Sequence, residues 1–469
     1  MQTPRTNKME SAPVNKLLLT ISLPIMFSMI MQAFYNIIDT IFIARFSEKA
    51  LSAVSLTFPM QTLMIAISIG TYIGINTFLA RTLGQKDFKK AQTIVQHGVL
   101  LSVFSYLAFL FFGLFYTRQY FVIQTTDTEI ITYGVDYMSV CLIFSVFLFG
   151  QQLFEKLLQV NAHSLLSMVS QLIGVAVNII LDPILIFGLM GMPALGAKGA
   201  AIATVIGQFA ALISGFMFHQ KFNKQLKFSF ANFRFDKAVI AEIYKIGLPA
   251  IMIQSVGSIA NFLFNGILLG FSDTATAVFG IYYKLQNFIF MPIYGLTSGM
   301  LPIMSYNLGA KHKTRVLATL RYSIVYMTAI MLSGTIIFQL APSQLLKLFG
   351  VSEDMISIGV PAIRIISFYF VFEGFCLISQ TGFQSFGKGF VSLVCSITRQ
   401  IFILLPIAYI MSLNGNINYV WLAYPITGII SLALCLLLWI NIYKKIISHF
   451  PEISTGQTVS DNKFPNCRK

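Results

Sequence analysis

The chain has 469 residues, of which 56% are hydrophobic and only 10% are charged. Soluble domains carry about 25% charged residues, so most of this chain cannot face water. Long apolar runs such as 401–411 and 429–442 do not alternate with polar residues, which excludes an outer-membrane barrel. The formal net charge of +15 is spread over short connections, which argues against a nucleic-acid partner. The composition therefore predicts an all-α polytopic protein embedded in a lipid bilayer.

Twelve apolar segments long enough to cross a bilayer as helices follow one another along the chain. The first is preceded by a polar stretch and is too long for a signal peptide, so we expect it to remain as a helix. The twelve spans are expected at residues 17–44, 51–80, 92–116, 130–158, 165–190, 196–218, 240–270, 275–305, 317–341, 355–384, 390–411 and 418–442.

Lysine and arginine residues are concentrated in every second connection between these spans. One side of the membrane receives clusters such as Lys86, Lys89 and Lys90, whereas the other receives isolated residues such as Lys49 and Lys347. The positive-inside rule places the clusters and both termini in the cytoplasm, which predicts a multi-pass protein of the cell (inner or plasma) membrane. The expected parts are an N-terminal cytoplasmic tail (1–16), an N-lobe (17–218), a cytoplasmic linker on the inner leaflet (219–239), a C-lobe (240–442) and a C-terminal cytoplasmic tail (443–469).

The two halves of the sequence repeat at a constant offset of 225 residues. Because each lobe has an even number of helices, the copies share one orientation and should be related by an axis along the membrane normal. Two Gly-x-x-x-Gly pairs at matching positions predict a hinge or a tight contact between the lobes. Matched residues include Asn36 with Asn261, Gly70 with Gly295, Gly74 with Gly299, Gly84 with Gly309 and Gln159 with Gln384.

Four carboxylates interrupt the apolar segments: Asp39, Glu155, Asp182 and Glu373. A charge inside the membrane is costly, so each of them should face a cavity or a partner. Each is either structural, bonding a neighbouring helix, or functional. No intramembrane Lys or Arg lies beside most of them in sequence, which favours a functional role.

Asp39 and Asp182 belong to repeated polar spacings. Tyr35 shares a helix face with Asp39, and Asn178 shares one with Asp182, each pair four residues apart. We expect both faces to line one oxygen-rich cavity in the N-lobe. Such a cavity can bind Na⁺, with Asp39, Asn178 and Asp182 as the metal ligands, or it can hold protons on neighbouring carboxylates. The residues alone leave both ions open.

The repeat distinguishes the lobes through its mismatches. Asp39 corresponds to Phe264 and Asp182 to Ile407, so the C-lobe lacks the acidic pair and the N-lobe is the expected ion-coupling lobe. No motif for ATP hydrolysis, metalloprotease or serine-hydrolase chemistry occurs, so neither an enzyme activity nor a bound cofactor is expected. The residues assigned to substrate binding are Tyr35, Asn36, Glu155 and Glu373.

Three motifs carry a family resemblance. They are Tyr-Asn-Ile-Ile-Asp-Thr (35–40) after a Leu-Pro pair, Leu-Gly-Gln-Lys-Asp (83–87) with its echo Leu-Gly-Ala-Lys (308–311), and Asn-Ile-Ile-Leu-Asp-Pro (178–183). Together with the repeat, they resemble the multidrug and toxic compound extrusion (MATE) family, in particular its MepA-like branch. This resemblance implies a V-shaped pair of six-helix lobes and an antiporter that exports lipophilic cations in exchange for H⁺ or Na⁺ by alternating access.

The resemblance also implies roles for single residues. Asp39, Asn178, Asp182 and Thr204 match the positions that form the N-lobe cation site of the family, and Glu373 falls where some members have an acidic residue. The leading interpretation is a cation-coupled exporter of small cationic drugs that works as a monomer. The alternative is a flippase for lipid-linked precursors, since related folds move such lipids. A flippase would need several intramembrane cations, and the available ones are Lys156, Lys284, Arg364 and Arg399.

Overall fold

The computed structural model describes residues 8–223, 226 and 233–450, and within these ranges the regular structure is entirely helical. The expected linker falls partly outside them, at 224–225 and 227–232. The first half contains α1 (Lys8–Ser11), α2 (Val14–Phe46), α3 (Glu48–Gly84), α4 (Phe88–Phe115), α5 (Thr117–Gln124), α6 (Thr128–Ile143), α7 (Val146–Val160), α8 (Ser164–Phe187) and α9 (Ala197–Phe222). The second half contains α10 (Lys237–Leu269), α11 (Asp273–Gly309), α12 (Lys313–Leu340), α13 (Pro342–Lys347), α14 (Glu353–Ser367), α15 (Phe370–Ser385), α16 (Gly389–Ile397), a π-helical segment (Thr398–Leu404), α17 (Leu405–Ser412) and α18 (Ile417–Lys445).

The described helices supply twelve membrane spans, as the apolar segments predicted. Ten stretches are long and apolar enough to cross alone, with α16 and α17 counted together, and the other two spans are bent helix pairs. α6 meets α7 at 46°, and α14 meets α15 at 49°. We had expected unbroken helices over 130–158 and 355–384, so these bends correct the prediction. Neither break contains Pro or Gly, the residues that usually mark a kink in a sequence.

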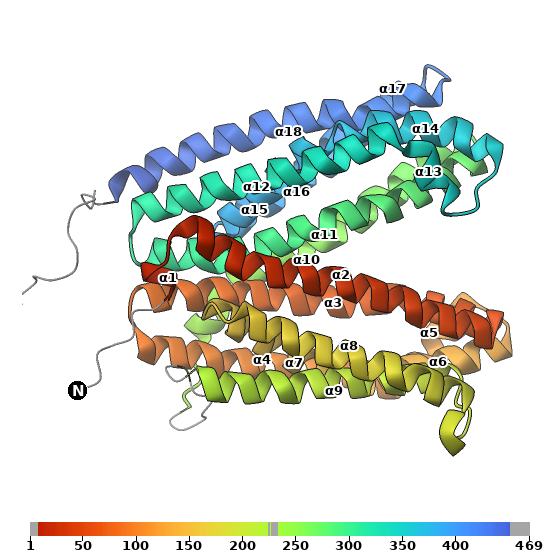
Figure 1. Cartoon of the computed structure of the whole chain (residues 1–469), viewed down its shortest axis with the longest axis horizontal. Coiled ribbons are helices and arrows are strands. Elements are labelled where there is room, and N and C mark those ends of the chain that lie inside the picture. Colours follow the sequence, from red (N-terminus) through yellow and green to blue (C-terminus); the bar gives the residue numbers. More distant parts are fainter. Residues whose placement is uncertain (1–7, 224–225, 227–232, 451–469) are drawn as a thin grey trace, which may run out of the picture.

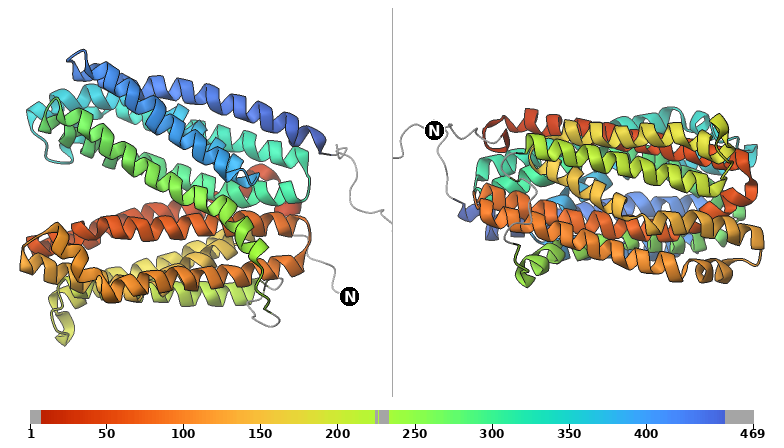
Figure 2. Two further views of the ribbon diagram at one scale, coloured as in Figure 1. Left: turned by 180° about the vertical axis from the view of Figure 1, so that it is seen from behind. Right: turned by 90° about the horizontal axis from the view of Figure 1, so that it is seen from below.

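The helices form two bundles, with α2–α9 in one and α10–α18 in the other (Figure 1). The bundles approach each other at the end that carries α1, and they diverge toward the end that carries α5 and α13. The view from behind shows the same divergence (Figure 2). We call these the convergent end and the divergent end. The expected V-shaped pair of lobes is therefore present.

The contact at the convergent end follows the internal repeat. α2 packs against α11, and α3 packs against α10 and α11. Gly84 touches the carbonyl of Tyr306, and Gly309 touches the carbonyl of Arg81, so closely that a β-carbon at either glycine would overlap the facing chain. Arg81 and Tyr306 are themselves related by the offset of 225, so the lobes make the same contact in both directions.

The recurring Gly-x-x-x-Gly pairs lie in the same contact. Gly70 and Gly74 of α3 pack against α10, whereas Gly295 and Gly299 of α11 pack against α2. Small residues at these positions let the helix backbones approach each other. Of the two predicted roles, hinge or tight contact, the structure directly provides the tight contact.

Two arginines add polar contacts at the convergent end. Arg81 Nη2 of α3 donates to the carbonyl oxygen of Ser385 at 2.8 Å, which joins the N-lobe to the C-lobe. Arg315 Nη2 of α12 donates to the carbonyl oxygens of Met9 and Ala12, each at 2.9 Å, and so fixes α1 against the C-lobe. The lobes are thus held together at this end by both packing and hydrogen bonds.

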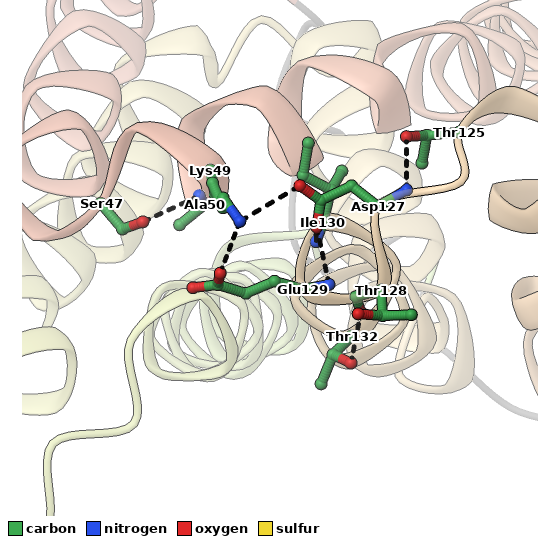
Figure 3. A network of polar contacts seen from close by, with 9 residues as sticks. All are labelled: Ser47, Lys49, Ala50, Thr125, Asp127, Thr128, Glu129, Ile130 and Thr132. Atoms are coloured by element: carbon green, nitrogen blue, oxygen red, sulfur yellow. Dashed lines mark hydrogen bonds and ion pairs between the residues drawn. The ribbon is translucent and has the colours of Figure 1, made fainter.

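At the divergent end, Lys49 joins the start of α3 to the loop before α6 (Figure 3). Its ammonium group lies 3.1 Å from Asp127 Oδ2 and 2.8 Å from Glu129 Oε2. Asp127 also caps α6, because its Oδ1 accepts the backbone N–H of Glu129 at 2.9 Å and that of Ile130 at 3.2 Å. The hydrogen bond from Ile130, followed by that from Lys49, lowers the pKa of Asp127.

We predict that Asp127→Asn lowers the melting temperature at neutral pH and has little effect in acid. Because the folded-state pKa of Asp127 is lowered, its charge contributes stability above the unfolded-state pKa of about 3.9. This contribution is lost as the pH falls through the folded-state pKa. Asparagine keeps the helix cap without the charge. Thermal unfolding in detergent at neutral and strongly acidic pH measures the effect, and an equal loss at both would contradict the prediction.

Candidate functional site

The N-lobe brings two acidic residues from distant parts of the sequence together. α2 carries Asp39, α8 carries Asp182, and these two helices pack against each other. Both carboxylates are buried, Asp182 completely and Asp39 with 8% of its surface exposed. They lie close enough to act on each other electrostatically. The predicted neighbourhood of the two residues is therefore present, while their role in ion coupling stays a prediction.

Three neutral polar side chains complete this acidic cluster. Asn178 Nδ2 of α8 donates to Asp182 Oδ1 at 3.3 Å and to Thr204 Oγ1 of α9, also at 3.3 Å. The side chain of Tyr35 on α2 lies close to that of Thr204. Polar contacts therefore run from α2 through α9 to α8. The residues matched to the family's cation site, Asp39, Asn178, Asp182 and Thr204, lie together.

Three oxygen atoms of the cluster have no hydrogen-bond partner among the described residues: Asp39 Oδ1, Asn178 Oδ1 and Asp182 Oδ2. Leaving a buried polar atom unpaired costs about 1–3 kcal/mol, so a ligand that satisfies several of them is favoured. Hard oxygen ligands fit Na⁺, and closely spaced carboxylates equally fit a proton. Within the described ranges, no three His, Cys, Asp or Glu side chains gather as metal ligands. The donors that the cluster offers to a cation are two carboxylate oxygens and one amide oxygen.

A hollow of about 460 Å³ adjoins the acidic cluster and shares Tyr35, Asn178 and Thr204 with it. Neutral amides make up much of the remaining wall, and they offer both donors and acceptors without a buried charge. Asn36, which the sequence assigned to substrate binding, is exposed and does not line this hollow. The glutamines in the wall are Gln32, Gln151, Gln152, Gln171 and Gln208.

The sequence did not lead us to these glutamines, nor to two residues of α6 near Asp39. Tyr137 and Cys141 are close enough to Asp39 to interact with it electrostatically, and Gln61 Nε2 donates to the Tyr137 hydroxyl at 3.2 Å. Uncharged side chains cost less in a membrane than carboxylates, so they stand out less in a sequence. The spacing of four residues from Tyr137 to Cys141 is the one regularity that could have pointed to them.

Glu155 lies on α7, outside the lining of the hollow. It is 5% exposed, and its Oε1 accepts a hydrogen bond from Gln151 Nε2 at 2.9 Å. Gln151 itself lines the hollow. Glu155 is therefore placed to orient this amide, whereas direct binding of substrate by Glu155 stays a prediction.

Glu373 of α15 has a cationic partner that the sequence did not reveal. Arg399, in the π-helical segment, forms an ion pair with it, and the Tyr369 hydroxyl donates to the same carboxylate. Arg399 Nη1 also donates to the Tyr369 oxygen at 3.0 Å. Glu373 and Arg399 are 8% and 4% exposed. Arg399 is distant from Glu373 in sequence, so the lack of a cation beside Glu373 in the sequence did not reveal this pairing. The assignment of Glu373 to substrate binding stays a prediction.

Comparisons with known proteins agree with this architecture. A family model described as MatE matches residues 24–184 and 249–410. The multidrug export protein MepA of Staphylococcus haemolyticus is 26% identical over 414 residues, which cover 88% of this chain and 90% of that protein. A protein of Shewanella oneidensis named FAD transporter is 25% identical over 425 residues, which cover 90% and 93% of the two chains.

Solved structures share the fold at lower sequence identity. The outward-facing conformation of a multidrug resistance MATE family transporter of the MOP superfamily gives a TM-score of 0.88 at 22% identity, over 96% of this chain and all 100% of that one. A MOP superfamily transporter from Pyrococcus furiosus, described by the reverse polarity of its binding pocket, gives 0.86 at 23% identity, over 95% and 100%. These likenesses establish the twelve-span, two-lobe fold.

We predict that Glu373→Leu destabilises the C-lobe by about 3–5 kcal/mol, because it leaves the buried Arg399 charged and without its carboxylate. The double variant Glu373→Leu/Arg399→Met should regain most of this loss, since apolar side chains of similar size can replace a buried pair. Thermal unfolding in detergent compares the variants. A double variant no more stable than Glu373→Leu would contradict the inferred pairing.

Proposed function

Because the chain belongs to the MatE family, we propose that it exports lipophilic cationic compounds in exchange for H⁺ or Na⁺ by alternating access. The observation that carries this proposal is the acidic cluster, whose unpartnered oxygens lie beside an amide-lined hollow. Two carboxylates in a membrane-embedded lobe are stable only when a cation or protons neutralise them. The cluster therefore alternates between cationic occupants.

Coupling follows from the side chains that the two sites share. Tyr35, Asn178 and Thr204 belong both to the acidic cluster and to the wall of the hollow. An ion bound by Asp39 and Asp182 cancels the negative field that would attract a cationic drug into the hollow. Occupancy by the ion and occupancy by the drug therefore oppose each other, which is the requirement for antiport.

The arrangement of the lobes supports an outward-open state. Arg81, Lys86 and Lys311 lie at the convergent end, and the positive-inside rule assigns such clusters to the cytoplasm. The divergent end then faces outward. Both lobes belong to one chain, so we propose that a single copy in the cell membrane is the working unit.

The flippase alternative is less well supported by the charges. An anionic lipid head group would need free intramembrane cations, but Arg399 is neutralised by Glu373. The acidic cluster of the N-lobe holds two carboxylates, Asp39 and Asp182, each with a buried oxygen that has no hydrogen-bond partner among the described residues. Export of cations fits this sign.

We predict that Asp39→Asn and Asp182→Asn fold normally and lose gradient-driven export. An amide cannot exchange a proton and attracts Na⁺ less strongly, whereas folding does not need a charge that has no cationic partner. Ethidium transport in proteoliposomes, with H⁺ and Na⁺ gradients imposed separately, should fall to the background of empty liposomes. Asp127→Asn, the same change at the divergent end, is the matched control. Normal export by either site variant would exclude that carboxylate from coupling.

Labelling with a membrane-impermeant maleimide tests the orientation. We predict that Lys89→Cys at the convergent end and Lys347→Cys at the divergent end react from opposite sides of the membrane, with Lys89→Cys in the cytoplasm. Both positions are exposed, and Cys141, Cys376, Cys395 and Cys435 are buried, so a Cys467→Ser background suffices. Reaction of both variants from one side would refute the proposed sidedness.

A further inference from the structure

A second pocket lies between the two lobes. Its volume is about 340 Å³, and its lining comes from α3 and α7 of the N-lobe and from α11 and α15 of the C-lobe. None of its residues belongs to the acidic cluster or to the amide-lined hollow. Its polar residues are Asn76, Lys156, Thr297, Ser298, Thr381 and Gln384.

This interlobe pocket sits on the axis that relates the two halves of the chain. Lys156 and Thr381 are equivalent at the offset of 225, and so are Asn76 and Leu301, and all four line the pocket. A residue and its own counterpart can share a pocket only at the axis. The equivalent residues differ chemically, so the N-lobe wall carries a charge and an amide where the C-lobe wall carries a hydroxyl and an apolar group.

Lys156 is the only charged residue in the lining of the pocket. Its Nζ donates to Gln159 Oε1 at 3.0 Å, and an ammonium group has two further hydrogens to donate. The neighbouring carboxylate of Glu155 attracts Lys156 electrostatically, but it accepts a hydrogen bond from Gln151 and is not part of the lining. The lining itself therefore contains one cationic group and no anionic one.

Asn76 provides a second, independent indication of a ligand. It is 2% exposed, and its Oδ1 has no hydrogen-bond partner among the described residues. This oxygen accepts hydrogen bonds, whereas Lys156 donates them. A group that combines an anionic acceptor with an N–H or O–H donor would satisfy both residues at once.

We propose that the interlobe pocket is a subsite for the acidic group of zwitterionic substrates, namely aromatic cations that also carry a carboxylate. This inference rests on the proposed export function and narrows its substrate class. The carboxylate accepts a charge-assisted hydrogen bond from Lys156, and Gln384 supplies a neutral donor on the opposite wall. The cationic part of the same molecule is attracted to the N-lobe hollow.

The spacing of the two sites on α7 suits such a molecule. Gln152 lines the hollow and Lys156 lines the interlobe pocket, four positions later on the same helix. A rise of 1.5 Å per residue separates these positions by about 6 Å along the axis. A fused aromatic ring system is long enough to span this distance, which is what the proposed subsite requires of its substrate.

A matched pair of dyes tests the subsite. Rhodamine B carries an aromatic cation and a carboxylate, and in its ethyl ester this carboxylate is replaced by a neutral ester group. Fluorescence anisotropy gives the Kd of each dye for the full-length protein in detergent, and proteoliposomes report its export. We expect Lys156→Gln to weaken binding of rhodamine B by about tenfold, as the loss of a charge-assisted hydrogen bond implies, and to leave binding of the ester within about twofold.

Two further variants make the outcome decisive. Lys156→Arg should retain selective binding of rhodamine B because it keeps the charge, and Lys198→Gln should bind like wild type because it removes an exposed lysine at the start of α9. Equal effects of Lys156→Gln on the two dyes, or none on either, would overturn the subsite. Failure of the wild type to export the ester would refute the proposed function instead, and the binding constants would still decide the subsite.

Discussion

The burial of Asp39 and Asp182 in one lobe, without a cationic partner among the described residues, is the constraint on which the rest of the N-lobe depends. Two ionised carboxylates in a membrane-embedded bundle repel each other and lack solvation. Asn178 and Thr204 hold part of the cluster by hydrogen bonds and leave other oxygens free. A cation or protons at the cluster therefore lower the free energy of the lobe, which is the basis of its proposed role in ion coupling.

The C-lobe has the same arrangement of helices, but its buried carboxylate is neutralised by a cation within the lobe. Glu373 is neutralised by Arg399 and bonded to Tyr369, so the C-lobe has no comparable attraction for a free cation. The repeat preserves what both lobes need in common, which is close contact through glycines at the convergent end. The two repeats thus keep the same packing between the lobes but differ in their buried charged residues. The lobes are similar in backbone and different in chemistry.

The sequence predicted features that depend on pattern within a helix or between repeats. Twelve spans, two lobes and the proximity of Asp39 to Asp182 followed from apolar length, the offset of 225 and the spacing of polar residues. The partner of Glu373 could not be predicted, because pairing with Arg399 depends on how α15 and the π-helical segment are rotated toward each other. The breaks at 144–145 and 368–369 contain neither Pro nor Gly, so composition gave no indication of them.

The bend before α7 positions residues of both pockets. α7 begins directly after the 46° bend and carries Gln151 and Gln152 in the hollow and Lys156 in the interlobe pocket. A straight helix would point this segment in a different direction, so the bend determines where both walls lie. Because Lys156 also faces α11 and α15 across the pocket, any movement of the lobes changes the interlobe pocket more than the hollow inside the N-lobe. Under the proposed alternating access, substrate groups held at the two sites would therefore be displaced differently by the movement of the lobes.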